Sequence, residues 1–254
     1  IMSDSHAHQG FLRFCTRGDV YIHRHISHQP SAQEFLRRQT LLDHKPGVLL
    51  SCRSEYPGRY QRQDRLVVNP PLSLTAQGNT LIIRALNARG QVLLPVFIRK
   101  FSNEPQVQLT RDRNQLTLVK ILGADHIDLD ERMRTRRSGL FELLRQILSL
   151  FASDQDKHLG LYGAFGYDLA FQLEAIQLRM PRPAEQRDMV LYLPDEIMVH
   201  DPATGLCQLI SYDFICEDEH GRLQTTGGLK REVNGSSLGS TSADVIAIPR
   251  SDHA

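Results

Sequence analysis

Two apolar runs near the end of the chain, residues 189–199 and 206–214, flank the segment Asp201-Pro202-Ala203-Thr204-Gly205. Asp, Pro and Gly are turn-forming residues, so this pattern predicts two antiparallel strands joined by a tight turn. Further strands are predicted over 19–23, 47–51, 66–68, 79–86, 91–98 and 115–122. The run 79–86 should form a hairpin with 91–98 through the four-residue loop 87–90.

Two segments have the spacing of helices. Residues 32–42 predict a short helix with Phe35, Leu36 and Leu41 facing inward. Residues 138–151 predict a longer helix, whose apolar stripe consists of Leu140, Leu144, Ile147, Leu148 and Phe151. Strands and helices do not alternate regularly, which argues against a doubly wound parallel sheet. The sequence therefore predicts an α+β fold of antiparallel β-sheets, sandwich-like and flanked by a few helices.

The composition changes along the chain and suggests three parts. Residues 1–30 are polar and histidine-rich, and we expect a loose arm with at most one strand. Residues 31–216 hold the apolar pattern of a folded domain. Residues 217–254 are rich in Gly, Ser, Thr and charge, so we expect an exposed linker.

Composition also excludes several classes of function. The formal net charge of +1 gives no general attraction to nucleic acid or to membrane surfaces. No run of eighteen apolar residues exists, and the first residues lack the apolar stretch of a secretory signal. We therefore expect a cytoplasmic protein that binds neither nucleic acid nor membrane.

The cysteines and histidines do not form a recognisable metal site. Cys15, Cys52, Cys207 and Cys216 contain no CxxC pair, so reduced thiols are expected. Imidazole is the commonest transition-metal ligand, which makes the early histidines candidates. However, they lack a Cys, Asp or Glu at a fixed spacing, and we expect them to be solvated. They are His6, His8, His23, His25 and His28.

The segment from Ser51 to Asp64 has the residues of an anion-binding bend. Pro57-Gly58 fits the centre of a type II turn, which would bring Tyr56 and Arg59 together. One arginine can bind a carboxylate through two parallel hydrogen bonds, and the Ser51 hydroxyl could add another. The alternative is an ordinary solvated hairpin, and the residues alone do not decide between the two. The arginines of this region are Arg53, Arg59, Arg62 and Arg65, and the acids are Glu55 and Asp64.

A second motif spans residues 160–174, where glycines recur at 160, 163 and 166. It matches neither a dinucleotide-binding fingerprint nor a P-loop. Closely spaced glycines indicate close backbone packing or the wall of a buried pocket, and both interpretations stay open. Asp168 could cap a helix that follows.

Several stretches together resemble the N-terminal region of anthranilate synthase component I, most closely the form in which synthase and glutaminase are fused. The likeness runs from about residue 30 to about residue 230. The stretches are GVLLS (47–51), EYPGRY (55–60), NPP (69–71), GLYGAFGYD (160–168) and LYLPDEI (191–197).

The resemblance implies part of an enzyme that converts chorismate, with glutamine or ammonia and magnesium, to anthranilate and pyruvate in tryptophan biosynthesis. It implies that tryptophan binds in this region as an effector. Chorismate and magnesium residues are expected in a C-terminal half, with a glutamine amidotransferase domain or subunit as partner. This chain would then hold no catalytic or metal-binding residue. The implied effector-binding residues are Leu50, Ser51, Cys52, Tyr56, Arg59 and Tyr167.

Two departures bear on the effector site. Leu49-Leu50-Ser51-Cys52 stands where many family members read Leu-Leu-Glu-Ser, and Gln61-Arg62-Gln63 stands where fused members tend to read Thr-Arg-Trp. Alternative hypotheses are a related enzyme similar to aminodeoxychorismate synthase, or a non-catalytic amino-acid-binding module. On the main hypothesis the chain is half of a larger chorismate-enzyme fold and is not expected to be catalytically competent alone.

Overall fold

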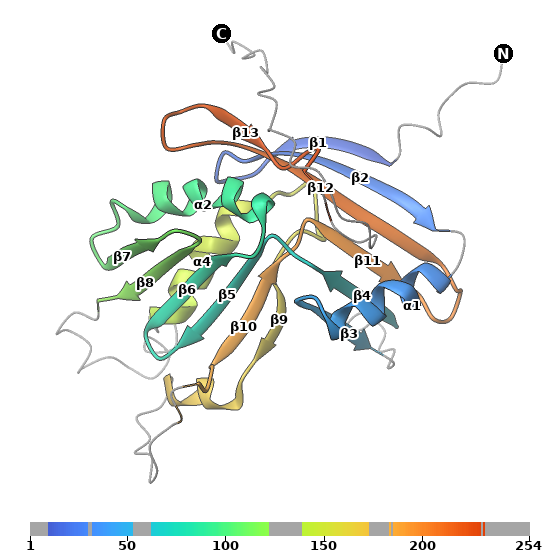
Figure 1. The fold of residues 1–254 in the computed structure, drawn as a ribbon, viewed down its shortest axis with the longest axis horizontal. Helices are drawn as coiled ribbons and strands as arrows, with labels where there is room; N and C mark the ends of the chain where they lie inside the picture. Colours follow the sequence, from blue (N-terminus) through green and yellow to red (C-terminus); the bar gives the residue numbers. More distant parts are fainter. Residues whose placement is uncertain are drawn as a thin grey trace.

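The computed structural model describes residues 10–29, 32–52, 62–121, 139–172, 183, 185–229 and 231. Within these residues the chain forms two β-sheets, and every strand pair is antiparallel (Figure 1). The predicted α+β fold of antiparallel sheets with few helices is confirmed.

The first sheet has the strand order β1-β2-β12-β11-β4-β3, with β13 paired to β12. Its strands are β1 (Phe11–Cys15), β2 (Tyr21–Gln29), β3 (Gly47–Cys52), β4 (Gln63–Val68), β11 (Glu196–His200), β12 (Cys207–Glu217) and β13 (Leu223–Thr225). The second sheet has the order β7-β8-β6-β5-β10-β9. Its strands are β5 (Leu72–Gln77), β6 (Thr80–Ala85), β7 (Val107–Asp112), β8 (Gln115–Lys120), β9 (Tyr162–Phe165) and β10 (Met189–Leu193).

The helices join the two sheets through a shared core. They are α1 (Ala32–Thr40), α2 (Ala88–Phe101) and α4 (Gly139–Phe151), with short 3₁₀ helices η1 (Leu41–Asp43) and η3 (Tyr167–Gln172). Helix α2 contacts β6 and β7 of the second sheet and β12 and β13 of the first. One apolar cluster accordingly includes side chains from both sheets, α2 and α4. A smaller cluster, centred on Phe35 of α1, covers the other face of the first sheet.

Several predicted elements are confirmed. β11 and β12 form the hairpin expected around residues 201–205, and Gly205 has the positive φ of 72° that its turn requires. Helices α1 and α4 and strand β8 lie where they were predicted. Two side chains were placed wrongly on the buried faces, because Leu36 is 59% exposed and Leu148 is 44% exposed.

The predicted hairpin over 79–98 is wrong in its second half, where residues 88–101 form α2. Asn87, expected in the loop, instead caps this helix, since its Oδ1 accepts a hydrogen bond from the Gly90 N–H at 3.2 Å. The apolar run looked like a strand because it is buried on most sides and contains Pro95, which is uncommon inside helices. Packing of α2 against strands of both sheets overrides the preference of this local sequence for a strand.

The single strand predicted over 189–199 is two strands in different sheets. β10 lies in the second sheet and β11 in the first, separated by Pro194 and Asp195. Proline lacks the N–H that would continue a ladder. Asp195 is buried where the chain crosses between the sheets, and its Oδ2 lies 2.9 Å from Arg89 Nε and 3.2 Å from Arg231 Nε.

The loose N-terminal arm and the linker are also corrected in part. Residues 11–29 form the β1–β2 hairpin, and β2 pairs with β12 along nine residues of each strand. β13 pairs with β12, and Arg231 forms ion pairs with the folded body. Packing against the long strand β12 orders segments whose polar composition suggested a loop. The division into domains itself stays a prediction.

Candidate functional site

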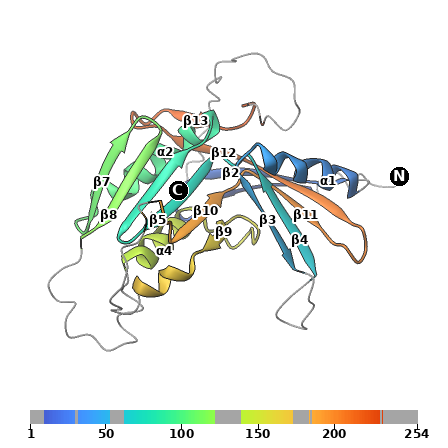
Figure 2. The same ribbon diagram turned by 60° about the horizontal axis from the view of Figure 1, so that its bottom comes forward.

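The end of β3 lies at the edge of the first sheet, close to the free edge of the second. β3 pairs only with β4 among the described strands, so the prediction of a buried strand is wrong here. The ladder sets Leu50 opposite Arg65, Ser51 opposite Asp64 and Cys52 opposite Gln63. β9 contacts β3, and Figure 2 shows the two strands beside each other. Side chains from both sheets can therefore meet at this place.

Ser51 lies on the face of β3 that is turned toward α1. Successive side chains of a strand point to opposite faces, and Leu49 belongs to the cluster under α1. The Ser51 hydroxyl donates a 2.6 Å hydrogen bond to Asp64 Oδ1. Asp64 Oδ2 lies 3.4 Å from His200 Nδ1, and the His200 ring lies 5.0 Å from that of Phe35. The hydroxyl proton of Ser51 is thus already engaged by a carboxylate.

Leu50 and Cys52 lie on the opposite face, together with Arg65. Arg65 donates from Nη1 to the Tyr162 hydroxyl at 3.3 Å, and from both Nε and Nη2 to Gln63 Oε1 at 3.2 Å. Tyr162 belongs to β9, so this contact bridges the two sheets. Leu50 is 38% exposed beside this guanidinium. We call the group Leu50, Gln63, Arg65, His158 and Tyr162 the Arg65 site.

His158 contributes a neutral imidazole to the Arg65 site. Its carbonyl oxygen accepts a hydrogen bond from the Tyr162 hydroxyl at 2.5 Å. Its Nδ1 atom is buried and has no hydrogen-bond partner within the part of the chain that the structure describes. Burial, aided by the positive charges of Arg65 and Arg24, holds the pKa of His158 below its ordinary value, against the opposing effect of Asp156.

Asp156 anchors the loop that carries His158. Its carboxylate lies 2.9 Å from Arg24 Nη1 and accepts hydrogen bonds from the Tyr212 hydroxyl at 3.1 Å and the Leu159 N–H at 2.8 Å. Burial opposes ionisation of Asp156. The hydrogen bonds from Leu159, Arg24 and the His158 N–H outweigh it and hold the pKa of Asp156 below its ordinary value. This ionised carboxylate fixes the loop against β2 and β12.

The structure brings together some, but not all, of the effector-binding residues that the resemblance implies. Leu50 and Cys52 share a face, whereas Ser51 lies on the other. Tyr167 is 91% exposed at the start of η3. Tyr56 and Arg59 lie outside the described residues. Sequence reasoning did not single out His158 or Tyr162, and it counted Arg65 only as one of several arginines. One sequence signal could have pointed to Tyr162, namely its position within the glycine motif of residues 160–174.

The glycine motif is explained by packing at two of its three positions. A Cβ on Gly163 would lie 2.1 Å from the carbonyl oxygen of Val190, and one on Gly166 would lie 3.0 Å from that of Arg187. A Cβ on Gly160 would meet nothing within 4 Å. Asp168 lies inside the first turn of η3 and accepts a hydrogen bond from Gln186, so it does not precede the helix as a cap.

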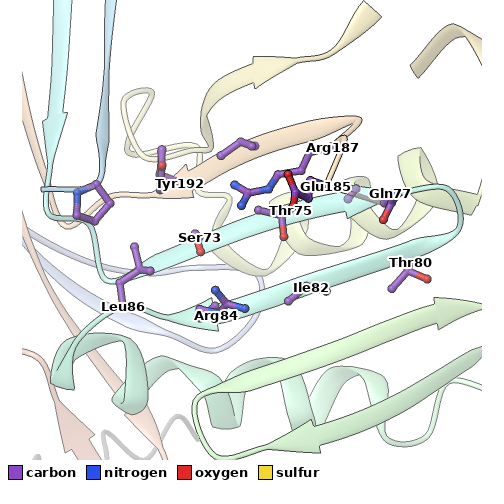
Figure 3. Close-up of a pocket in the computed structure, with 13 residues that line it drawn as sticks. Ser73, Thr75, Gln77, Thr80, Ile82, Arg84, Leu86, Glu185, Arg187 and Tyr192 are labelled. Carbon is purple, nitrogen blue, oxygen red and sulfur yellow. The ribbon is translucent and has the colours of Figure 1, made fainter. Parts of the chain in front are cut away.

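A separate hollow of about 520 Å³ lies on the open face of the second sheet. Figure 3 shows Ser73 and Thr75 on β5, with Arg84 on the neighbouring strand and Arg187 on the other side. Its charged side chains, Arg84, Arg187 and Glu185, are exposed. Exposed charges lose little free energy when left unpaired. The hollow can hold a small polar molecule, but its lining favours no particular class.

Across the described ranges, no cluster of three or more His, Cys, Asp and Glu side chains could hold a metal ion. His23 packs on Phe11 with ring centroids 5.8 Å apart, and His6 and His8 lie outside those ranges. No helix in the described residues has the length and apolar character needed to cross a membrane.

Comparison with known proteins shows that the chain is similar to proteins named as synthases. No protein-family model matches it. It is 42% identical over 205 residues to the protein named anthranilate synthase of Azospirillum brasilense, which covers 80% of this chain and 28% of that protein. It is 32% identical over 172 residues to anthranilate synthase component 1 of Serratia marcescens, covering 65% of this chain and 31% of that protein. For component 1 of Vibrio parahaemolyticus the identity is 29% over 188 residues, covering 73% and 34%.

The chain spans about a third of the length of these curated relatives. It is a relative of the anthranilate synthases, as the sequence motifs predicted. More particularly, it is similar to a part of anthranilate synthase component 1, and the length covered is consistent with an N-terminal region.

Proposed function

We propose that this chain is the N-terminal, effector-binding part of an anthranilate synthase, a carbon–oxygen lyase of tryptophan biosynthesis. The intact enzyme would convert chorismate and glutamine or ammonia to anthranilate and pyruvate. The observation that carries this proposal is the 42% identity over 80% of the chain to a protein named anthranilate synthase. The identities to proteins named component 1 support it further.

This chain would need partners to form anthranilate. It would act in the cytoplasm with a chorismate-binding C-terminal half and a glutamine amidotransferase domain or subunit. Magnesium would bind in that other half. The match to the Azospirillum brasilense protein covers 205 residues, which are 28% of that protein. The match to the Serratia marcescens protein covers only 172 residues, yet these are 31% of that protein. The former protein is therefore the longer, which supports a likeness to the fused form.

Tryptophan is the proposed effector, and the end of β3 is the proposed place of binding. Two arrangements support this. Leu50 is partly exposed and gives an apolar contact, and Arg65 directly across the ladder gives a cation for a carboxylate. Cys52, one of the two positions where the sequence departs from the family, lies on the same face of β3 as Leu50 and Arg65.

The test is an assay of the polypeptide encoded by the continuous reading frame that contains this sequence. We expect anthranilate to form from chorismate when ammonia or glutamine is supplied, and L-tryptophan to inhibit its formation. The 254-residue chain alone, assayed in parallel, should form none. Formation of aminodeoxychorismate instead would favour the related chorismate enzyme, and absence of any chorismate turnover would favour a non-catalytic module.

A further inference from the structure

The chain turns after β13 and has two separate attachments beyond the turn. Thr226 still belongs to the first sheet, because its N–H and its hydroxyl make two 2.9 Å hydrogen bonds with the backbone of Phe214. Two glycines follow, of which Gly228 has a φ of 80° that favours glycine. Beyond them Leu229 packs against the main apolar cluster, and Arg231 contacts carboxylates. We call Gly227, Gly228, Leu229 and Arg231 the strap.

The backbone of the strap makes only local hydrogen bonds. The Gly227 N–H donates to the Thr225 hydroxyl at 3.0 Å, and the Leu229 N–H donates to the Thr226 carbonyl oxygen at 3.2 Å. In the described part of the chain, no backbone hydrogen bond joins the strap to another strand. The strap is therefore held by its side chains, by apolar contact at Leu229 and by charge at Arg231.

Arg231 contacts three carboxylates and one carbonyl group. Its Nη2 lies 2.8 Å from Asp213 Oδ1 and donates to the Tyr212 carbonyl oxygen at 2.7 Å. Its Nε lies 3.2 Å from Asp195 Oδ2, and its Nη1 lies 3.6 Å from Glu196 Oε1. Burial opposes the positive charge, but the three carboxylates outweigh it and raise the pKa of Arg231 above its ordinary value. These contacts fasten the strap both to β12 and to the crossing between the two sheets.

These contacts can break without leaving a buried carboxylate unpaired. Asp195 keeps Arg89, whose Nε lies 2.9 Å away, and both side chains are 2% exposed. Glu196 keeps Arg38 at 3.1 Å. The side chain of Asp213 is 42% exposed, so water can solvate it. Loss of one ion-pair partner is strongly destabilising when it leaves an uncompensated buried charge, and that does not happen here.

We propose that the strap opens and closes as a unit while both sheets stay folded, with Gly227 and Gly228 as the hinge and Arg231 as the residue that holds it closed. Hinges are a few residues that absorb a change of φ and ψ, and local openings of this kind cost less than global unfolding. The chain continues beyond Arg231. The closed strap fixes the point from which the following residues start, and the open strap releases it. This movement does not depend on the proposed function.

Hydrogen–deuterium exchange on the full 254-residue chain tests the movement. Arg231→Gln should raise the exchange rate of the Leu229 amide roughly 10- to 100-fold, the loss expected for hydrogen bonds between charged groups, while amides of β11 keep their rates. Arg231→Lys keeps the charge without the planar fork and should raise the rate less. The matched control is Arg222→Gln. Arg222 is exposed just before β13 and pairs with Asp218, so its replacement should leave the Leu229 rate unchanged.

Salt gives a second measurement, because it screens charges that become exposed when the strap opens. Raising NaCl from about 0.05 M to about 1 M should speed exchange at Leu229 in the unmodified chain. The same change should have less effect in Arg231→Gln, which has already lost the charge. An equal salt effect in the two chains would show that charge does not hold the strap closed and would overturn the proposal.

Asp213→Asn is a milder variant that leaves the buried ion pairs of Asp195 and Glu196 intact. It should raise the exchange rate of Leu229 less than Arg231→Gln does, and it decides the matter if Arg231→Gln does not fold. Faster exchange at Leu229 alone supports the proposal. Unchanged exchange at Leu229 in Arg231→Gln overturns it. Equal acceleration at Leu229 and in β11, in either variant, also overturns it, because the contacts of Arg231 would then belong to the cooperative fold.

Discussion

Two glycines of the same motif have very different surroundings. Gly163 in β9 lies against the backbone of β10, where a Cβ would sit 2.1 Å from the Val190 carbonyl oxygen and 2.8 Å from the Leu191 Cα. Gly160, three residues earlier, faces open space. Spacing alone could not separate these cases, because the contact depends on the strand pairing of β9 with β10.

Gly163→Ala should therefore lower the free energy of unfolding by about 2–3 kcal/mol, since backbone atoms cannot move aside without disturbing the ladder. Gly160→Ala, the matched control, should change it by less than about 0.5 kcal/mol. Urea denaturation followed by circular dichroism measures both. Similar values for the two variants would refute the packing explanation of the motif.

The arginines show the same limit of sequence reasoning. The sequence placed Arg65 in a run of four arginines but could not tell which of them is half-buried. That property comes from β9, which lies about a hundred positions later in the chain and brings Tyr162 to Arg65. The burial of Arg65 could not be predicted from the sequence, because it depends on a contact between residues far apart in the chain.

At the scale of elements, local patterns predicted those structures that local interactions determine. Helix α4 has a clear apolar stripe, and the β11–β12 hairpin has a turn with its own sequence signature. Helix α2 was missed because Pro95 and an almost continuous apolar run are also typical of strand boundaries and buried strands. The break between β10 and β11 was missed because both are apolar and only two residues separate them.

The start of α2 depends on Asn87, which makes two hydrogen bonds. Its Oδ1 accepts from the Gly90 N–H at 3.2 Å, and its Nδ2 donates to the Pro70 carbonyl at 3.0 Å. Asn87→Ala should lower the free energy of unfolding by about 1–2 kcal/mol, because it removes the cap and the tie to Pro70. Asn87→Ser keeps a capping oxygen and should lose less. Equal losses in thermal or urea denaturation would show that the cap contributes nothing.

At the scale of the whole molecule, buried charges hold the two sheets and their connections together. Asp195 lies at the crossing between β10 and β11 and pairs with Arg89 of α2 and with Arg231 near the end of the described chain. Asp156 ties the loop after α4 to β2 and β12 through Arg24 and Tyr212. Since one apolar core also spans both sheets, we expect them to unfold in a single transition.

Asp156 gives this architecture a pH dependence whose sign follows from its lowered pKa. In the unfolded chain an Asp titrates near pH 3.9, and in the fold it titrates lower. The ionised carboxylate therefore contributes stability above about pH 4, and the contribution is lost as the pH falls toward the folded-state pKa. Asp156→Asn, which leaves Arg24 without its anion, should lower the free energy of unfolding by about 3 kcal/mol at neutral pH.

The difference between the Asp156→Asn and unmodified chains should shrink as the pH is lowered below about 4, because the unmodified chain then loses the same charge. Asp154→Asn is the matched control two residues away. Asp154 is 95% exposed and pairs with Arg17 at 3.1 Å, so its replacement should matter by less than about 0.5 kcal/mol at any pH. Urea denaturation at a series of pH values measures both differences. A deficit in Asp156→Asn that stayed constant down to the lowest pH at which the chain folds would mean that hydrogen-bond geometry, and not the charge of Asp156, holds the loop to the first sheet.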